Sequence, residues 1–114
     1  MNDPLPGTVP HLLPLAGRID ASNATQLDDQ LRKLIERGIT TIVVDLGQVT
    51  YISSRGLRIL LLAHRRQQRH GGRLVLRHLA PRIHKMLQLC GFDRLLEIEP
   101  EASPAAPETP RVQE

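Results

Sequence analysis

The strongest constraint on this fold is a β-branched run that leads, through a short glycine-containing segment, into an apolar helical pattern. Residues 40–46 (TTIVVDL) form a nearly continuous β-branched run, which is typical of a strand buried on both faces. We expect this strand to end at Leu46, directly after Asp45, and a turn that contains Gly47 to follow. Ser53 and Ser54 then precede the helical pattern that begins at Leu57. Both serines should therefore lie at a helix N-terminus, where outward-pointing backbone N–H groups favour negative charge.

Strands alternate with helices along the rest of the chain. The expected strands cover residues 11–19, 40–46, 73–77 and 95–98, and the expected helices run from residue 23 to Gly38, from the serines to about Arg69, and from Pro81 to Gly91. Because helices can serve as crossovers between parallel strands, the pattern predicts an α/β fold with a mostly parallel sheet of four to five strands and alternating helices. Pro14 places the first strand at an edge or at a bulge.

The core should be aliphatic, because 40% of the 114 residues are apolar and only 2% are aromatic. The first helix shows one apolar stripe at helical spacing, formed by Leu27, Leu31, Leu34 and Ile35. Ser22 or Asn23 is expected to cap this helix, and Gln26, three residues after Asn23, would complete a variant of the capping box.

Several residues that could carry chemistry have simpler interpretations. Cys90 falls at helical spacing after Ile83, Met86 and Leu87, so we expect a buried packing residue. A single cysteine excludes an internal disulfide and a multi-cysteine metal site and fits a reducing compartment. Asp20 and Asp45 are expected to stabilise turns or cap helices rather than form a catalytic pair. Surface positions are expected for His64, His70, His78 and His84, which lack metal-ligand spacing.

The chain should form one domain with two tails. We expect a flexible lead-in at 1–10, the domain at 11–99 and a disordered Pro/Ala/Glu tail at 100–114. The beginning of the chain lacks the pattern of an export signal. The longest apolar run, residues 59–63, is far shorter than the roughly 20 residues that cross a bilayer. A cytoplasmic protein without membrane insertion is therefore expected.

The net charge of +3 conceals a polarised distribution: residues 1–54 carry −2, residues 55–94 carry +9 and residues 95–114 carry −4. Arg58, Arg65 and Arg69 share one helical stripe, which is either a solvated helix face or a surface for an anionic partner. The low aromatic content argues against nucleic acid as that partner, since little is available for base stacking.

The serine pair also has a purely structural interpretation, because serine is a preferred helix N-cap. One of the two serines is expected to fill that position. Gly56 is unusual in a first helical turn, where it costs roughly 1 kcal/mol in helix propensity. Its missing side chain would let another backbone or a phosphate approach closely.

Taken together, these segments resemble a STAS domain, the module shared by anti-sigma factor antagonists and sulfate transporter tails. The resemblance covers roughly residues 11–98 and depends on the order and spacing of several short pieces. These pieces are Gly17-Arg18-Ile19-Asp20-Ala21, Ile42-Val43-Val44-Asp45-Leu46 with Val49, Tyr51-Ile52-Ser53-Ser54-Arg55-Gly56-Leu57, Ala80-Pro81-Arg82-Ile83 and Leu89-Cys90-Gly91-Phe92.

The resemblance implies roles for individual residues. The family motif is commonly Asp-Ser-Ser/Thr-Gly-Leu, and its first serine is phosphorylated by an anti-sigma factor kinase. Ser54 takes that position here, Ser53 replaces the aspartate and Arg55 replaces a small residue. The resemblance thus implies phosphorylation at Ser54 and a partner-binding surface comprising Asp20, Ser53, Ser54, Arg55, Gly56, Leu57 and Arg58.

The implied function is that of an anti-sigma factor antagonist, a protein-binding switch rather than an enzyme, with no cofactor or metal of its own. Its partner would be an anti-sigma factor with a histidine-kinase-like ATPase domain and serine kinase activity, opposed by a serine phosphatase. A monomer or weak dimer is expected. The alternative within the same fold is an accessory subunit of a membrane lipid transporter. Direct nucleic-acid binding is disfavoured by the low aromatic content, and catalysis is the least expected function.

Overall fold

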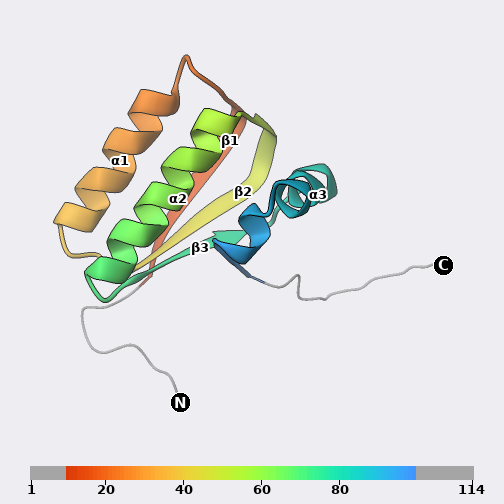
Figure 1. Cartoon of the computed structure of the whole chain (residues 1–114). Coiled ribbons are helices and arrows are strands. Elements are labelled where there is room, and N and C mark those ends of the chain that lie inside the picture. The colour runs from red at the N-terminus through yellow and green to blue at the C-terminus, as the bar shows by residue number, and fades with distance from the viewer. Residues whose placement is uncertain (1–9, 100–114) are drawn as a thin grey trace.

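The computed structural model describes residues 10–99, which form a four-stranded sheet with three α-helices (Figure 1). The elements are β1 (His11–Ile19), α1 (Ala24–Glu36), β2 (Thr41–Ile52), α2 (Ser54–Arg69), β3 (Arg73–Arg77), α3 (Pro81–Cys90), a 3₁₀ turn (Phe92–Arg94) and β4 (Glu97–Ile98). The strand order is β1-β2-β3-β4 and every pairing is parallel, which confirms the predicted α/β class. The expected tails lie outside the described residues, apart from Pro10.

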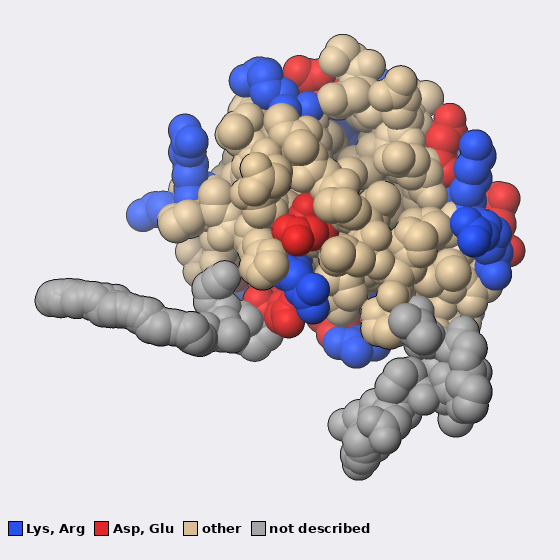
Figure 2. Space-filling model, turned by 180° about the vertical axis from the view of Figure 1, so that it is seen from behind, with Lys and Arg blue, Asp and Glu red and all other residues tan. Residues whose placement is uncertain are grey.

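The main core lies between the sheet and the helices. The stripe of α1 is buried as predicted, and it meets the alternate residues Ile42, Val44 and Leu46 of β2 in one aliphatic cluster. Helices α1 and α2 lie side by side over the sheet (Figure 1). Since neighbouring strand residues point to opposite faces, Val43 and Val75 point away from these helices. Uncharged side chains cover most of the molecule when it is seen from behind (Figure 2).

β1 is an edge strand with irregular pairing, as Pro14 predicted. Pro14 pairs with Asp45 and Ala16 with Gln48, so β2 contains one extra residue between the two pairs. Proline is tolerated here because an edge strand needs to donate hydrogen bonds on one side only.

β2 is longer than predicted, and the expected glycine turn is absent. The strand runs through Asp45 and Gly47 to Ile52, because β-bulges absorb its extra residues without ending the pairing. Asp45 stabilises the bulge: its Oδ1 accepts the Gly47 N–H at 2.9 Å and lies 3.1 Å from Nδ1 of His78. These contacts, with the Gly47 N–H first, lower the pKa of the Asp45 carboxyl. The strand consequently ends directly at Ser53.

The predicted capping box of α1 is wrong. Asn23 occupies the N-cap position, but its side chain makes no capping hydrogen bond. Instead Asn23 Nδ2 donates to the Arg18 carbonyl at 2.7 Å, and Asn23 Oδ1 accepts the Asp20 N–H at 3.0 Å. The asparagine thus fixes the loop between β1 and α1, because both polar atoms of its side chain bond to backbone groups at the start of that loop.

Two further burial predictions are wrong. Cys90 is exposed although it lies at helical spacing from Ile83 and Leu87, the two buried residues of α3, because it is the last residue of this helix. His64 is buried at 7% exposure, on the core side of α2. Polar residues on the inner side of a helix are difficult to recognise when they interrupt an otherwise apolar stripe.

Gln67 is a buried polar residue that the sequence did not single out. Its side-chain amide donates to the carbonyls of Ile39 at 2.9 Å and Arg73 at 3.1 Å. It therefore joins the C-terminal part of α2 to the segments that lead into β2 and begin β3. Within residues 10–99, no helix is long and apolar enough to span a membrane.

We predict that Gly56→Ala destabilises the domain. A Cβ atom at Gly56 would lie 2.8 Å from Cγ2 of Ile19 and 3.0 Å from Cγ1 of Ile52. Overpacking of this kind costs about 1–3 kcal/mol, against a gain of about 1 kcal/mol in helix propensity. The free energy of unfolding, measured by urea denaturation, should fall by about 1 kcal/mol. Gln68→Ala, at an exposed position of the same helix, is the control, and a Gly56→Ala protein as stable as its parent would contradict the prediction.

Candidate functional site

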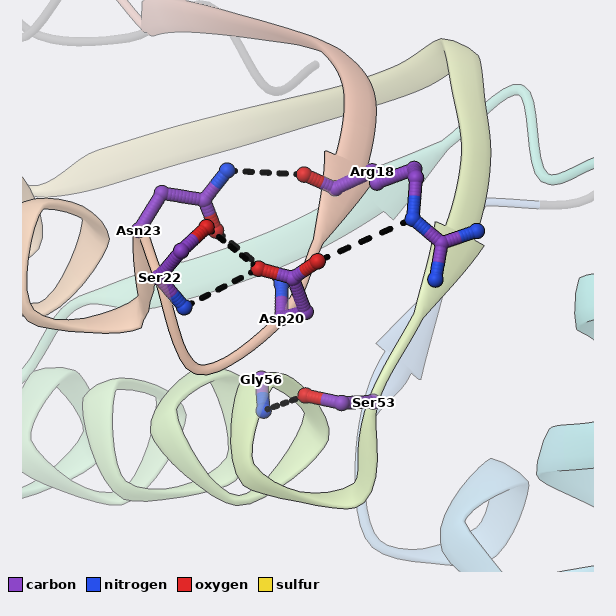
Figure 3. Close-up of polar contacts among 6 residues, drawn as sticks. All are labelled: Arg18, Asp20, Ser22, Asn23, Ser53 and Gly56. Atoms are coloured by element: carbon purple, nitrogen blue, oxygen red, sulfur yellow. Dashed lines mark hydrogen bonds and ion pairs between the residues drawn. The ribbon is translucent and has the colours of Figure 1, made fainter.

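The N-terminus of α2 is capped by Ser53, as the serine pair predicted. Ser53 has extended backbone angles, and its Oγ accepts the Gly56 N–H at 3.1 Å (Figure 3). Its own N–H donates to the Ile19 carbonyl at 2.8 Å. Ser53 therefore ties the start of α2 to the end of β1, and its hydroxyl is already used within the domain.

Ser54, in contrast, is exposed, and no hydrogen bond joins its hydroxyl to another group within residues 10–99. It is the first residue of α2 and is exposed, as is Arg55. Ser53 accepts the N–H groups of Gly56, through its side chain, and of Leu57, through its carbonyl. The N–H groups of Ser54 and Arg55 are the remaining ones of the first turn, which has no intrahelical acceptors for them. A negatively charged group on Ser54 would thus be electrostatically favourable.

The turn after β1 places an ionised carboxylate beside this helix end (Figure 3). Asp20 Oδ1 accepts the Ser22 hydroxyl at 2.6 Å and the Ser22 N–H at 3.0 Å, and Oδ2 lies 3.7 Å from Nε of Arg18. The Ser22 hydroxyl, then its N–H, lower the pKa of the Asp20 carboxyl, and Arg18 adds to the effect. A carboxyl with a pKa below its usual acidic value is ionised at neutral pH.

Arg18 and Tyr51 extend the surface next to Asp20, and the sequence had assigned them no separate role. The Arg18 guanidinium lies 4.3 Å from the centre of the Tyr51 ring, a cation–π contact. Tyr51 is 41% exposed, although tyrosine is large enough to bury substantial area in an interface. In the sequence, Tyr51 stood out only as the first residue of the segment 51–57 that supports the family resemblance.

The seven residues predicted to bind a partner divide into two groups. Ser54, Arg55 and Arg58 are exposed, whereas Asp20 and Ser53 are partly exposed. Gly56 and Leu57 are buried. Gly56 accommodates the side chains of Ile19 and Ile52, not a ligand, and Leu57 is 4% exposed within the core. Gly56 and Leu57 therefore position the N-terminus of α2 through their packing in the core.

Within the described part of the chain, the remaining candidate residues do not come together in a second site. His70, His78 and His84 are exposed, as predicted. In residues 10–99, no group of three or more His, Cys, Asp or Glu side chains is arranged to hold a metal ion. Asp20 and Asp45 each accept a backbone N–H from a residue two positions later, which confirms their local structural roles.

The architecture is a parallel α/β module that exposes a serine at a helix N-terminus beside an acidic turn. A family model described as "Mlab, STAS domain" matches residues 8–97, and the chain belongs to the STAS domain family. The chain is also similar to a putative anti-sigma factor antagonist, BtrV, of Bordetella bronchiseptica. The two are 37% identical over 78 residues, which are 68% of this chain and 67% of BtrV.

Two solved structures of SpoIIAA show the same fold. The unphosphorylated form of this anti-sigma factor antagonist has a TM-score of 0.64 at 21% identity, covering 80% of this chain and 79% of SpoIIAA. The phosphorylated form, described as a Bacillus cell fate determinant, has a TM-score of 0.64 at 21% identity, covering 86% and 89% of the two chains. At 21% sequence identity, this similarity establishes the fold alone.

We predict that the two adjacent serines differ sharply in their contribution to stability. Ser53→Ala removes the acceptor of the Gly56 N–H and should lower the free energy of unfolding by about 1 kcal/mol. Ser54→Ala removes an exposed hydroxyl and should change it by less than about 0.5 kcal/mol. Urea denaturation of both variants measures the difference. Equal losses for both, or a larger loss for Ser54→Ala, would contradict the assignment of Ser53 as the cap.

Proposed function

We propose that this protein is an anti-sigma factor antagonist that acts as a binding switch controlled by phosphorylation of Ser54. The observation that carries the proposal is the exposed Ser54 hydroxyl at the start of α2, next to a capping serine that is already engaged. The relatives described as anti-sigma factor antagonists support the same role. In the unmodified state, Ser54 and the neighbouring Asp20 turn dock against the anti-sigma factor.

Phosphorylation would release the partner by changing local charge. The partner, an anti-sigma factor with a histidine-kinase-like ATPase domain, would transfer the γ-phosphoryl group of ATP to Ser54 Oγ, leaving ADP and a proton. The phosphate adds about −1.5 to −2 charge. The helix N-terminus accommodates that charge within the domain, whereas a packed interface does not. A serine phosphatase would restore the binding-competent form.

The domain itself needs no catalytic group or cofactor for this cycle. The kinase supplies ATP and chemistry, and this chain supplies the acceptor and the docking surface. Arg55, which replaces the small residue of the family motif, provides an exposed guanidinium next to the acceptor. A guanidinium forms strong charge-assisted hydrogen bonds with phosphate. Arg55 would therefore help to hold the phosphate against the domain after modification.

A second candidate function is that of an accessory subunit of a membrane lipid transporter. The observation that favours it is the basic character that Arg55 and Arg58 give to the helix end, together with Ser53 in place of the motif's aspartate. In this case the same edge of the domain would bind a transporter ATPase without a phosphorylation cycle. Affinity purification from the native host separates the two functions, because the first requires a serine kinase and the second a transporter subunit as the stoichiometric partner.

We predict that Ser54→Asp abolishes binding of the anti-sigma factor and that Ser54→Ala retains it. The aspartate places a negative charge in the interface, whereas the alanine removes only a hydroxyl. Thr40→Asp is a matched control, because it adds the same charge at an exposed position before β2, at the opposite end of that strand. Isothermal titration calorimetry with the purified partner measures all three variants. If Ser54→Asp binds as tightly as the parent and the control, the switch is refuted.

A further inference from the structure

A basic groove lies between α1 and α2 and begins at Ser54. It has a volume of about 490 Å³. Its walls carry four arginines, one aspartate and two aliphatic side chains, and its lining comprises Thr25, Asp28, Arg32, Ser54, Arg55, Arg58, Ile59, Leu62 and Arg66. This set differs from the arginine stripe expected from the sequence: Arg58 belongs to the groove, whereas Arg65 and Arg69 are absent from its lining. The groove combines residues from two helices that are far apart in the sequence.

The charges in this groove are only partly compensated. Asp28 pairs with Arg32 at 2.9 Å and with Arg66 at 3.6 Å. Among the ion pairs of residues 10–99, none involves Arg55 or Arg58. Both of these side chains are exposed. Two guanidinium groups thus remain available for an incoming anion at the end of the groove that adjoins Ser54.

The dimensions of the groove exceed those of a single phosphate. Ser54 and Arg66 are twelve residues apart on α2, which corresponds to roughly 18 Å at about 1.5 Å per residue. An extended peptide of about five residues covers the same length at about 3.3 Å per residue. The arrangement therefore suits a chain molecule with several anionic groups.

The apolar residues of the groove lining favour a peptide over a nucleic acid as the ligand. Leu62 is 40% exposed on the groove wall and Ile59 lies beside it in the lining. Aliphatic surface favours an aliphatic side chain, whereas single-stranded nucleic acids stack their bases on aromatic residues. No aromatic side chain belongs to this lining.

We propose that the groove between α1 and α2 binds an acidic segment of a partner protein, with its carboxylates paired to Arg55 and Arg58 and an aliphatic side chain on Leu62. The inference builds on the proposed function, because the segment would belong to the partner that docks at Ser54. Arginine forms bidentate, charge-assisted hydrogen bonds with carboxylates, which fixes the segment in one register. The interface would thus extend from the serine along the full groove.

The test uses a synthetic pentapeptide, acetyl-Glu-Glu-Leu-Glu-Glu-amide, titrated into the full-length ¹⁵N-labelled protein and followed by NMR. Amide shifts should change at Thr25, Arg55, Arg58 and Leu62. The double variant Arg55→Ala/Arg58→Ala should lower the affinity for the peptide at least tenfold. The matched control Arg65→Ala/Arg69→Ala removes the same charge from exposed positions outside the lining and should stay within twofold of the parent.

Several outcomes would overturn the inference. These are absence of shift changes in the groove, equal weakening by the two double variants, and tighter binding of a single-stranded oligonucleotide of equal charge. The two double variants are then compared for binding to the anti-sigma factor. If that factor binds the parent and both variants equally, the groove inference fails while the proposed function stands. If the factor does not bind the parent, the proposed function fails, and the peptide titration still decides whether the groove accepts an acidic segment.

Discussion

The close approach of α2 to the ends of β1 and β2 at Gly56 is the constraint on which the site depends. With hydrogen in place of a side chain, Gly56 lets the branched side chains of Ile19 and Ile52 pack directly against the helix. The Ser53 N–H can then reach the Ile19 carbonyl, and the helix starts at the edge of the sheet. The internal packing of the domain thus determines which serine caps and which one faces the solvent.

The exposed edge combines charges of both signs in a small area. The ionised Asp20 carboxylate lies in the turn beside the helix end, and Arg55 and Arg58 lie on the helix itself. Such a mixed surface can be complementary to a partner in one state of Ser54 and repulsive in the other, because a single phosphate reverses the local balance. A switch of this kind requires no rearrangement of the fold, which agrees with the short, well-anchored loop that Asn23 holds in place.

The sequence predicted the elements whose signal is local. The stripe of α1, the limits of β3 and the start of α3 at Pro81 follow from periodicity and from residues with restricted backbone angles. The length of β2 was missed because a bulge at Gly47 resembles a turn when the pairing partner is unknown. Asn23 was misread because an asparagine before a helix can bond either to the first turn or back to the preceding loop, and here it bonds back to Arg18 and Asp20. Gln67 was missed because its hydrogen bond to Ile39 joins segments that only the folded chain brings together.

The local geometry at Ser53, Ser54 and Asp20 was predictable, because the cap, the first helical residue and the turn depend on neighbours in the sequence. The role of Gly56 was not, since its neighbours Ile19 and Ile52 come from two different strands. The groove was equally hidden: Asp28 and Arg66 meet only because α1 and α2 pack side by side. Sequence patterns thus identify the chemistry of a surface more readily than its shape.

The most direct test of the central claim is phosphosite mapping by mass spectrometry of this protein isolated from its native host, with the partner-bound and free fractions analysed separately. The account predicts phosphate on Ser54 in the free fraction and an unmodified Ser54 in the bound fraction. Phosphorylated Ser54 in the bound fraction, or its absence from both fractions under every growth condition, would contradict the account.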